Sequence, residues 1–294
     1  MIGQTCFIGQ TSVFPVNTGE KISGPQRPNS SPLFTGRRDV LDKLKVFFHR
    51  PTSDMVVRRS CLLWGMGGIG KTQICLKFIE EMFDRQVITL LFITLDLFLN
   101  NSLLHVFWVD ASSLENVLIS LRGIATQGSG MSGSVGSVLQ WISRIQGEWL
   151  IVFDNADDIS PGVVARFIPP GNRGNILITS RNRSMGRVIA FENLIEITEM
   201  EEPDAITLLL RASHLDSLPE YEQAAKQIVA KLGCIPLAID QAGAYIEAGK
   251  CGISKYLRRF SRHRQTLMSD TAFTGASGYN QTVYGTWDLF FQEI

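Results

Sequence analysis

The sequence has no apolar run long enough to cross a membrane and no recognisable export signal. Its longest apolar stretch covers residues 87–99 and is interrupted by Asp96, whereas a helix needs about 20 apolar residues to span a bilayer. The amino terminus, MIGQTCFIGQ, lacks both the basic segment and the sustained apolar stretch of a secretory signal. These absences predict a cytoplasmic protein without a membrane partner.

Paired cysteines and an excess of one charge are also missing. The five cysteines are an odd number without a C-x-x-C pair, which argues against a disulfide framework and against a zinc site. Lys and Arg total 28 and balance 28 Asp and Glu, so the composition argues against a nucleic-acid partner. The basic cluster at residues 258–264 contains Phe260, four residues after Tyr256, and this spacing predicts a core-facing helix rather than a nucleic-acid surface.

The chain does contain a regular alternation of apolar strands and amphipathic helices over residues 32–198. The apolar runs are nearly continuous, and this is typical of strands that helices cover on both faces. One predicted helix start carries the capping-box pair Ser112 and Glu115. The sequence therefore predicts an α/β domain with a parallel sheet, whose strands include residues 61–64, 106–110, 149–154, 175–180 and 194–197.

The flanking regions differ from this α/β domain. Residues 1–31 mix Gly, Pro, Ser, Asn and Thr without a period, which predicts a flexible leader. Residues 199–265 carry helical periods only, broken by Pro219, Gly233 and Gly249, and are expected to form a small all-α domain.

The segment GMGGIGKT at residues 65–72 matches the phosphate-binding pattern G-x-x-x-x-G-K-[ST], between a predicted strand and a predicted helix. Its glycines let the backbone curl so that N–H groups point at phosphate oxygens, and the helix start adds positive potential. Lys71 is expected to reach the β- and γ-phosphates, and the Thr72 hydroxyl is expected to ligate Mg²⁺.

The same segment also fits the dinucleotide fingerprint G-x-G-x-x-G. That fingerprint needs an acidic residue about 20 positions further on, at the end of the next strand. The region offers only Asp96, which lies inside the apolar stretch, so a nucleoside triphosphate is favoured. The predicted strand 149–154 ends in Asp154, where a Mg²⁺ bound to phosphates would lie. Many strands end in an Asp that merely caps a helix, so this second motif gains its weight from the first.

In chain order, these motifs resemble those of NB-ARC domains in STAND-class P-loop NTPases of the fungal NLR-like type. The resemblance covers residues 34–294 and implies a P-loop sheet, a helical domain and, over 266–294, a linker with the start of a winged helix. The matching pieces are FTGRRD for the entry motif, GMGGIGKT for Walker A, VFWVDAS for the second strand, LIVFDNADD for Walker B, ILITSRN for the sensor strand and LGCIPLAIDQAGAYI for the GLPLA helix.

The resemblance implies roles for individual residues. Lys71, Asp154 and Arg181 would act at the phosphates, with Arg181 as the γ-phosphate sensor and Thr72 and Asp154 holding Mg²⁺. Pro236 of the helical domain would lie against the adenine. The implied nucleotide contacts are Gly36, Arg37, Gly65, Met66, Gly67, Gly68, Ile69, Gly70, Lys71, Thr72, Gln73 and Pro236.

The implied function is that of a signalling switch that binds ADP or ATP, and whose γ-phosphate biases the arrangement of its domains. The implied partners are the adenine nucleotide, Mg²⁺ and, in the ATP state, further copies of the chain, in a fungal immune or incompatibility pathway. Two alternatives stay open. One is an ordinary P-loop enzyme such as a kinase or motor ATPase, and the other is a nucleotide-gated transcription regulator.

Three positions depart from the family pattern. Arg38 stands where the entry motif has Glu, and Cys234 stands where GLPLA has its Gly. Asn155 follows Asp154 where many relatives place a second acid, and an amide cannot accept the proton of an attacking water. We therefore expect at most slow ATP hydrolysis, with Asp157 or Asp158 as the substitute acid.

The stretch 86–105 interrupts the resemblance, which expects the helix after Walker A to lead almost directly into residues 106–110. Two hypotheses remain for it: translation of an unspliced intron, and an extra strand or hairpin at the sheet edge. The chain also ends before the Met-His-Asp motif of a complete winged helix, and no effector domain is recognisable ahead of residue 34. It therefore resembles a truncated switch core.

Overall fold

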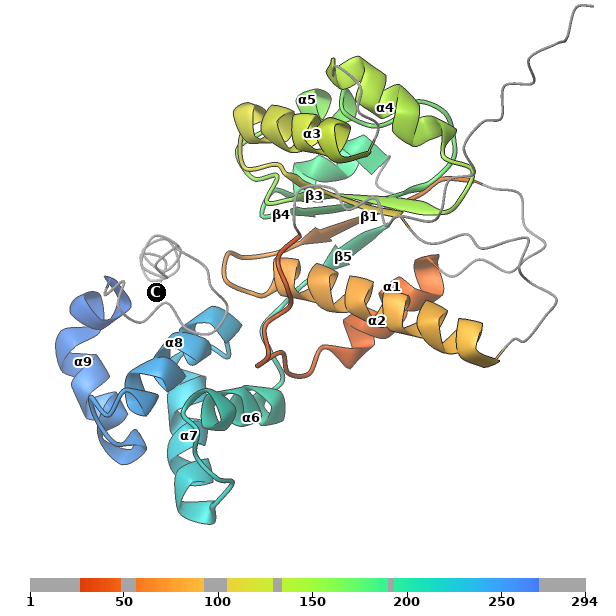
Figure 1. Cartoon of the computed structure of the whole chain (residues 1–294). Coiled ribbons are helices and arrows are strands. Elements are labelled where there is room, and N and C mark those ends of the chain that lie inside the picture. The colour runs from red at the N-terminus through yellow and green to blue at the C-terminus, as the bar shows by residue number, and fades with distance from the viewer. Residues whose placement is uncertain (1–26, 49–56, 93–104, 129–133, 190–192, 270–294) are drawn as a thin grey trace, which may run out of the picture.

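The computed structural model describes residues 27–48, 57–92, 105–128, 134–189 and 193–269. These residues form an α/β layer and a cluster of helices that packs beside it (Figure 1). Neither the layer nor the cluster contains, among the described residues, a helix with the length and apolar character that a bilayer crossing requires.

The α/β layer is built on a five-stranded sheet in the order β2-β3-β4-β1-β5. Every neighbouring pair is parallel, which confirms the predicted fold class. The order places the carboxyl ends of β1, β3 and β4 side by side, so the loops that follow these strands meet. The strands are β1 (Arg59–Trp64), β2 (His105–Asp110), β3 (Trp149–Asp154), β4 (Asn175–Ser180) and β5 (Leu194–Glu196).

Helices cover both faces of the sheet, as the continuous apolar strands predict. Leu63 and Phe78 belong to the hydrophobic core on one face, and Phe107 and Trp149 belong to the core on the other. The first face is covered by α1 (Arg38–Phe48) and α2 (Lys71–Phe92), and the second by α3 (Leu114–Gly128), α4 (Val135–Arg144) and α5 (Pro161–Ala165) (Figure 1).

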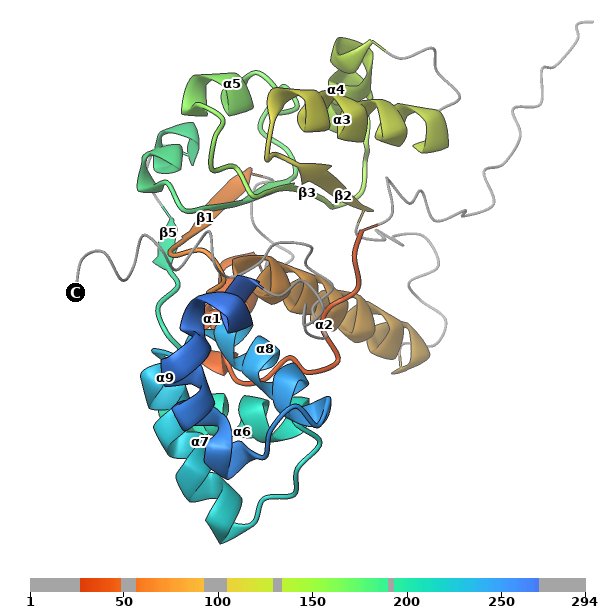
Figure 2. The ribbon, with the colours of Figure 1, turned by 90° about the vertical axis from the view of Figure 1, so that its left-hand side faces the viewer.

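The helical cluster lies on the side of the sheet that α1 and α2 cover, away from α3 and α4 (Figures 1 and 2). Tyr256 and Phe260 are each 2% exposed, which confirms that the basic segment turns its aromatic residues into the core. The first hydrophobic core runs without a break from the sheet into this cluster. The cluster consists of α6 (Glu202–Ala212), α7 (Pro219–Lys231), α8 (Pro236–Glu247) and α9 (Ile253–Ser269).

One local prediction differs from the structure. The capping box was wrong: the Ser113 hydroxyl accepts the Asn116 N–H at 3.1 Å, whereas the Ser112 hydroxyl donates to Asp110 at 2.6 Å. Ser112 thus takes part in the turn after β2, and Ser113 caps the helix instead. The first part of the stretch 86–105 is helical, because α2 continues to Phe92, and its residues 93–104 lie outside the described part.

Two short elements had no sequence prediction, α5 and the 3₁₀ helix η1 (Arg183–Ile189). Both follow strands at the carboxyl edge of the sheet. The end of the predicted flexible leader is held in place, because Ser30 and Ser31 donate hydrogen bonds to Glu80 and Gln73 of α2. Residues 1–26 of that leader and the predicted winged-helix start beyond residue 269 lie outside the described residues.

Candidate functional site

The glycine-rich loop leads from β1 into α2 at the carboxyl edge of the sheet, next to the end of β4. Gly65 has φ +150°, and a Cβ there would lie 2.3 Å from the backbone oxygen of Ile197. Gly68 has φ +74° and faces Leu237 of α8, whose N–H donates to the Gly68 carbonyl at 3.2 Å. The loop therefore needs glycine both for its curvature and for its contact with the helical cluster.

Lys71 opens α2 and folds back over this loop. Its Nζ donates to the carbonyl oxygens of Gly65 at 2.7 Å and Met66 at 2.9 Å. Burial lowers the pKa of Lys71 to about 8, and the Asp157 carboxylate opposes that shift. An anionic group in the loop would be a stronger partner for this ammonium than two neutral carbonyls are.

Asp154 ends β3 and receives two hydroxyl donors. Thr72 Oγ1 donates to its Oδ1 at 2.8 Å, and Thr179 Oγ1 of β4 donates to the same atom at 2.6 Å. Burial raises the pKa of Asp154, while the two hydroxyl groups act in the opposite direction. The contact between Thr72 and Asp154 joins the two predicted magnesium ligands.

Arg181 follows β4, beside the loop that follows β3. Its Nε lies 2.9 Å from Oδ2 of Asp157, and its backbone N–H donates to Oδ1 at 2.6 Å. Ser180 secures this loop by donating from its hydroxyl to the Ala156 carbonyl at 2.6 Å. The predicted phosphate sensor is thus held by a carboxylate, and Asp158, the other candidate acid, is exposed.

Arg37 lies on the opposite side of the loop. The residue has φ +62°, and its guanidinium donates to the backbone oxygens of Glu199 at 3.1 Å and Ile69 at 3.2 Å. Burial lowers the pKa of Arg37, and four nearby carboxylates act in the opposite direction. Arg37 therefore links the glycine-rich loop to the segment that enters α6.

These elements enclose a cavity of about 150 Å³ where the sheet edge meets the helical cluster. We call the part of its lining formed by Lys71, Thr72 and Arg181 the polar end. We call the part formed by Leu33, Phe34, Met200, Leu208, Pro236 and Leu237 the apolar end. The cavity is therefore suited to a ligand that has an anionic part and a flat apolar part.

The cavity gathers most of the predicted contact residues but not all of them. Gly36, Gly65, Met66 and Asp154 lie outside its lining. The carbonyls of Gly65 and Met66 accept hydrogen bonds from Lys71, and Asp154 accepts one from Thr72. These three residues therefore position side chains of the lining without belonging to it. The predicted residues that do line it are Arg37, Gly67, Gly68, Ile69, Gly70, Lys71, Thr72, Gln73, Arg181 and Pro236.

Sequence reasoning missed several residues of the site. Thr179 was detectable in principle, because it is the penultimate residue of β4, the strand beside β3 in a parallel sheet. Asp240 lines the cavity from α8 and is 6% exposed, and an acid within the mostly apolar run PLAIDQAGAYI was its signal. Leu33 and Phe34 come from a turn, closed by the Phe34 N–H that donates to the Ser31 carbonyl, and the sequence of this segment carries no periodic pattern. Among the described residues, no group of three His, Cys, Asp or Glu side chains could hold a metal on its own.

Comparison with known proteins finds no matching family model but several relatives. An NLR-like protein of Hyaloscypha variabilis is 29% identical over 229 residues, which cover 71% of this chain and 21% of the relative. A probable disease resistance protein of Arabidopsis thaliana is 28% identical over 193 residues, or 60% of this chain and 20% of the relative. The resemblance to NB-ARC domains of STAND-class P-loop NTPases is confirmed. This NB-ARC-like chain spans about a fifth of the length of these relatives.

A solved structure supports the same fold. The ORC2 protein of Aeropyrum pernix, in ADPNP and ADP complexes, superposes with a TM-score of 0.57 over 83% of this chain and 74% of that one. The two sequences are 13% identical, so the similarity concerns the fold alone. The chain therefore shares its fold with this ORC2 protein.

Proposed function

We propose that this chain is the nucleotide-binding switch core of an NLR-like signalling protein, and that it holds ADP or ATP with Mg²⁺. One observation carries the proposal: a phosphate-binding loop and a helical cluster wall the same cavity, from its polar and its apolar end. A nucleotide would then touch both parts of the molecule at once.

The phosphates would lie at the polar end. Lys71 would exchange the carbonyls of Gly65 and Met66 for phosphate oxygens, and the start of α2 would add the positive end of its dipole. Burial lowers the pKa of this lysine, and an anionic neighbour would favour its charged form. The gain in charge pairing supports tight binding of a diphosphate tail.

Mg²⁺ would lie beside the phosphates. Thr72 and Asp154 supply a hydroxyl and a carboxylate oxygen in mutual contact, and hard oxygen donors suit this ion. When bound, the ion would neutralise part of the phosphate charge. Thr179 would keep the Asp154 carboxylate oriented towards it.

The base would lie at the apolar end, which favours adenine as the family resemblance implies. Pro236 would pack against it from α8, with Gly36 and Arg37 at its rim. The Leu237 N–H donates to Gly68, so the start of α8 is joined to the phosphate loop. A γ-phosphate that moves this loop would therefore bias the helical cluster relative to the sheet.

Hydrolysis is expected to be slow at most. Asn155 follows Asp154 with φ +62°, and its N–H donates to Thr179 Oγ1 at 2.8 Å. An amide at this position cannot act as a general base. Of the two substitute acids, Asp157 is paired with Arg181 and Asp158 is exposed. A switch that keeps its nucleotide fits these contacts better than an enzyme that turns over rapidly.

The wider setting of the switch follows from the family. The nucleotide-binding domain would cover residues 32–198 and the helical domain residues 199–265. We expect a cytoplasmic protein that acts in a fungal immune or incompatibility pathway and self-associates in its ATP state.

The test is to denature the purified 294-residue chain and identify the nucleotide that it releases. We expect ADP from the parent and none from Lys71→Ala, because that variant loses the ammonium that meets the phosphates. Lys231→Ala removes an exposed lysine from α7 and serves as the matched control. Folded parent protein that releases no nucleotide, and gives no calorimetric heat with ADP or ATP at any magnesium concentration, would contradict the proposal.

A further inference from the structure

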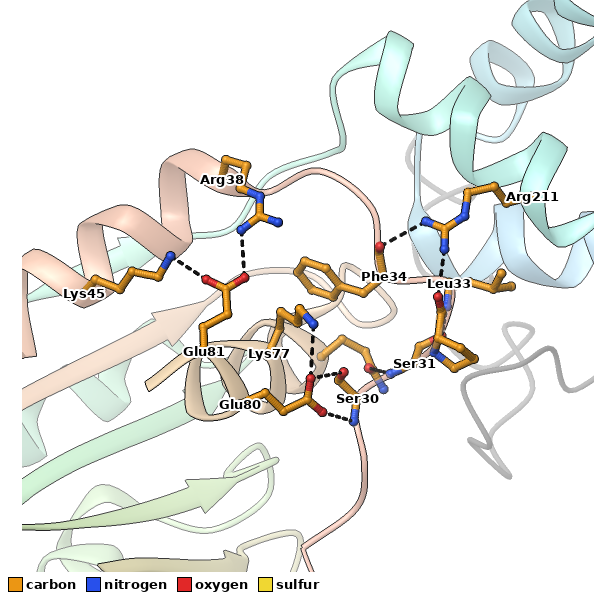
Figure 3. Close-up of polar contacts among 12 residues, drawn as sticks. Ser30, Ser31, Leu33, Phe34, Arg38, Lys45, Lys77, Glu80, Glu81 and Arg211 are labelled. Atoms are coloured by element: carbon orange, nitrogen blue, oxygen red, sulfur yellow. Dashed lines mark hydrogen bonds and ion pairs between the residues drawn. The ribbon is translucent and has the colours of Figure 1, made fainter. Parts of the chain in front are cut away.

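Residues 30–35, which we call the strap, run from α2 to α6 (Figure 3). At one end the Ser30 N–H and hydroxyl donate to the two carboxylate oxygens of Glu80, at 3.0 and 2.7 Å. Lys77 lies 3.2 Å from the same carboxylate. The Ser31 N–H donates to Gln73 Oε1 at 2.7 Å. The first end of the strap is therefore fixed to the helix that begins with Lys71.

The other end of the strap is held by one side chain of the helical cluster. Arg211 of α6 donates from Nη2 to the Pro32 carbonyl at 2.8 Å. Its Nη1 donates to the Phe34 carbonyl at 3.2 Å and to Thr35 Oγ1 at 3.0 Å. A planar guanidinium can serve three acceptors in fixed directions, which a lysine ammonium cannot do with the same geometry.

The strap is also a wall of the cavity. Leu33 and Phe34 belong to its apolar end, and Ser31 and Thr35 line it as well. Gly36 follows directly, and a Cβ there would lie 2.0 Å from the carboxylate of Asp204, so the backbone passes close to α6. The position of this wall therefore depends on contacts with two helices from different parts of the molecule.

We propose that Arg211 is a positioning residue that fixes the strap as the wall of the base end of the cavity. The proposal rests on the nucleotide binding proposed above. Removing Arg211 leaves the strap hydrogen-bonded to α2 at Ser30 and Ser31 and removes the hydrogen bonds that join its other end to α6. The base end then opens while the phosphate end, built by the glycine-rich loop, keeps its contacts. Through Arg211, binding of the base thereby depends on the position of α6.

The experiment compares a ligand that has a base with one that lacks it. Dissociation constants for ADP and for inorganic pyrophosphate, the latter by competition against labelled ADP, are measured with Mg²⁺ for the parent, Arg211→Ala and Arg211→Lys. We expect Arg211→Ala to weaken ADP about tenfold, since several charge-assisted hydrogen bonds are lost, and to leave pyrophosphate unchanged. The dissociation constant of Arg211→Lys for ADP should lie between those of the parent and Arg211→Ala. The matched control, Arg122→Ala, removes an exposed arginine of α3 and should change neither constant.

A second measurement keeps the proposal testable if Arg211→Ala folds poorly. Hydrogen exchange of the strap amides in the ADP-bound protein should rise in the milder variant Arg211→Gln, while exchange in β3 stays unchanged. Unchanged ADP affinity and strap protection, or equal losses for ADP and pyrophosphate, would overturn the role of Arg211. A folded parent that binds neither ligand would instead contradict the proposed function.

Discussion

At the scale of single residues, two carboxylates, Asp154 and Asp157, orient the polar side chains of the site through hydrogen bonds. Asp154 accepts hydroxyl hydrogens from threonines on two elements, and Asp157 binds both the backbone and the side chain of Arg181. In the first arrangement burial raises the pKa of Asp154, and the two hydroxyl hydrogen bonds act in the opposite direction, in favour of the charged form. The second keeps an arginine at the cavity wall in one orientation.

This second pair gives a prediction about nucleotide preference. Asp157→Asn removes the negative charge that holds Arg181, so the guanidinium becomes available to a γ-phosphate. Because the arginine side chain is 40% exposed, the pair is worth about 1 kcal/mol at most, and we expect the ATP-to-ADP affinity ratio to rise about threefold to fivefold. Calorimetry with both nucleotides measures this ratio. Asp158→Asn, at an exposed neighbour, should leave it unchanged, and an unchanged ratio in Asp157→Asn would refute the prediction.

At the scale of elements, the helical cluster depends on one close approach. A Cβ on Gly243 of α8 would lie 2.3 Å from the Cβ of Ala212 at the end of α6, and 2.9 Å from its backbone carbon. The two helices pack at this distance because glycine has no side chain. Both helices carry residues of the cavity, since Leu208 comes from α6 and Pro236 from α8.

Gly243→Ala should therefore lower the free energy of unfolding by about 1–3 kcal/mol, because the added methyl group forces α6 and α8 apart. Urea unfolding followed by circular dichroism measures the change. Gly162→Ala in α5 is the control, since a Cβ there has no atom within 4 Å, and it should be neutral or raise the free energy by up to about 1 kcal/mol. Equal effects of the two substitutions would show that the close approach does not matter.

At the scale of the whole molecule, one hydrophobic core passes from the sheet through α2 into the helical cluster, and the cavity sits across that passage. Cys234 lies in the connection that leads into α8, half-exposed, with its carbonyl accepting the Met200 N–H at 3.0 Å. A nucleotide that draws the start of α8 onto the loop should make this connection less accessible.

Alkylation of cysteines tests this closure. Burial raises the pKa of Cys61 to about 12, so that thiol carries almost no thiolate at pH 8 and should stay unmodified in the folded protein. Cys234 should react, and saturating ADP should slow its modification several-fold. Cys251, half-exposed and outside the cavity lining, is the internal control and should react at the same rate with and without ADP. Peptide mass spectrometry reads all three, and equal slowing at Cys234 and Cys251 would argue against closure.

The sequence by itself determined the five parallel strands, the α/β class and the phosphate loop. These features are local: a continuous apolar run specifies a covered strand, and the spacing of glycines before Lys71 and Thr72 specifies a backbone shape. It also placed Asp154 and Arg181 at strand ends, which a parallel sheet brings to one edge. Serine capping after β2 failed as a prediction because the side chains of the turn compete for the same partners.

Only the tertiary structure decided which side chains meet across the cavity. Thr179 reaches Asp154, and Arg211 reaches the strap 177 residues earlier in the chain at Phe34, through contacts that leave no periodic trace in the sequence. Such contacts depend on how separate elements pack, and packing is set by the sum of many side-chain volumes rather than by any one motif. The motifs therefore predicted where phosphate would bind, and the fold decided what would surround the base.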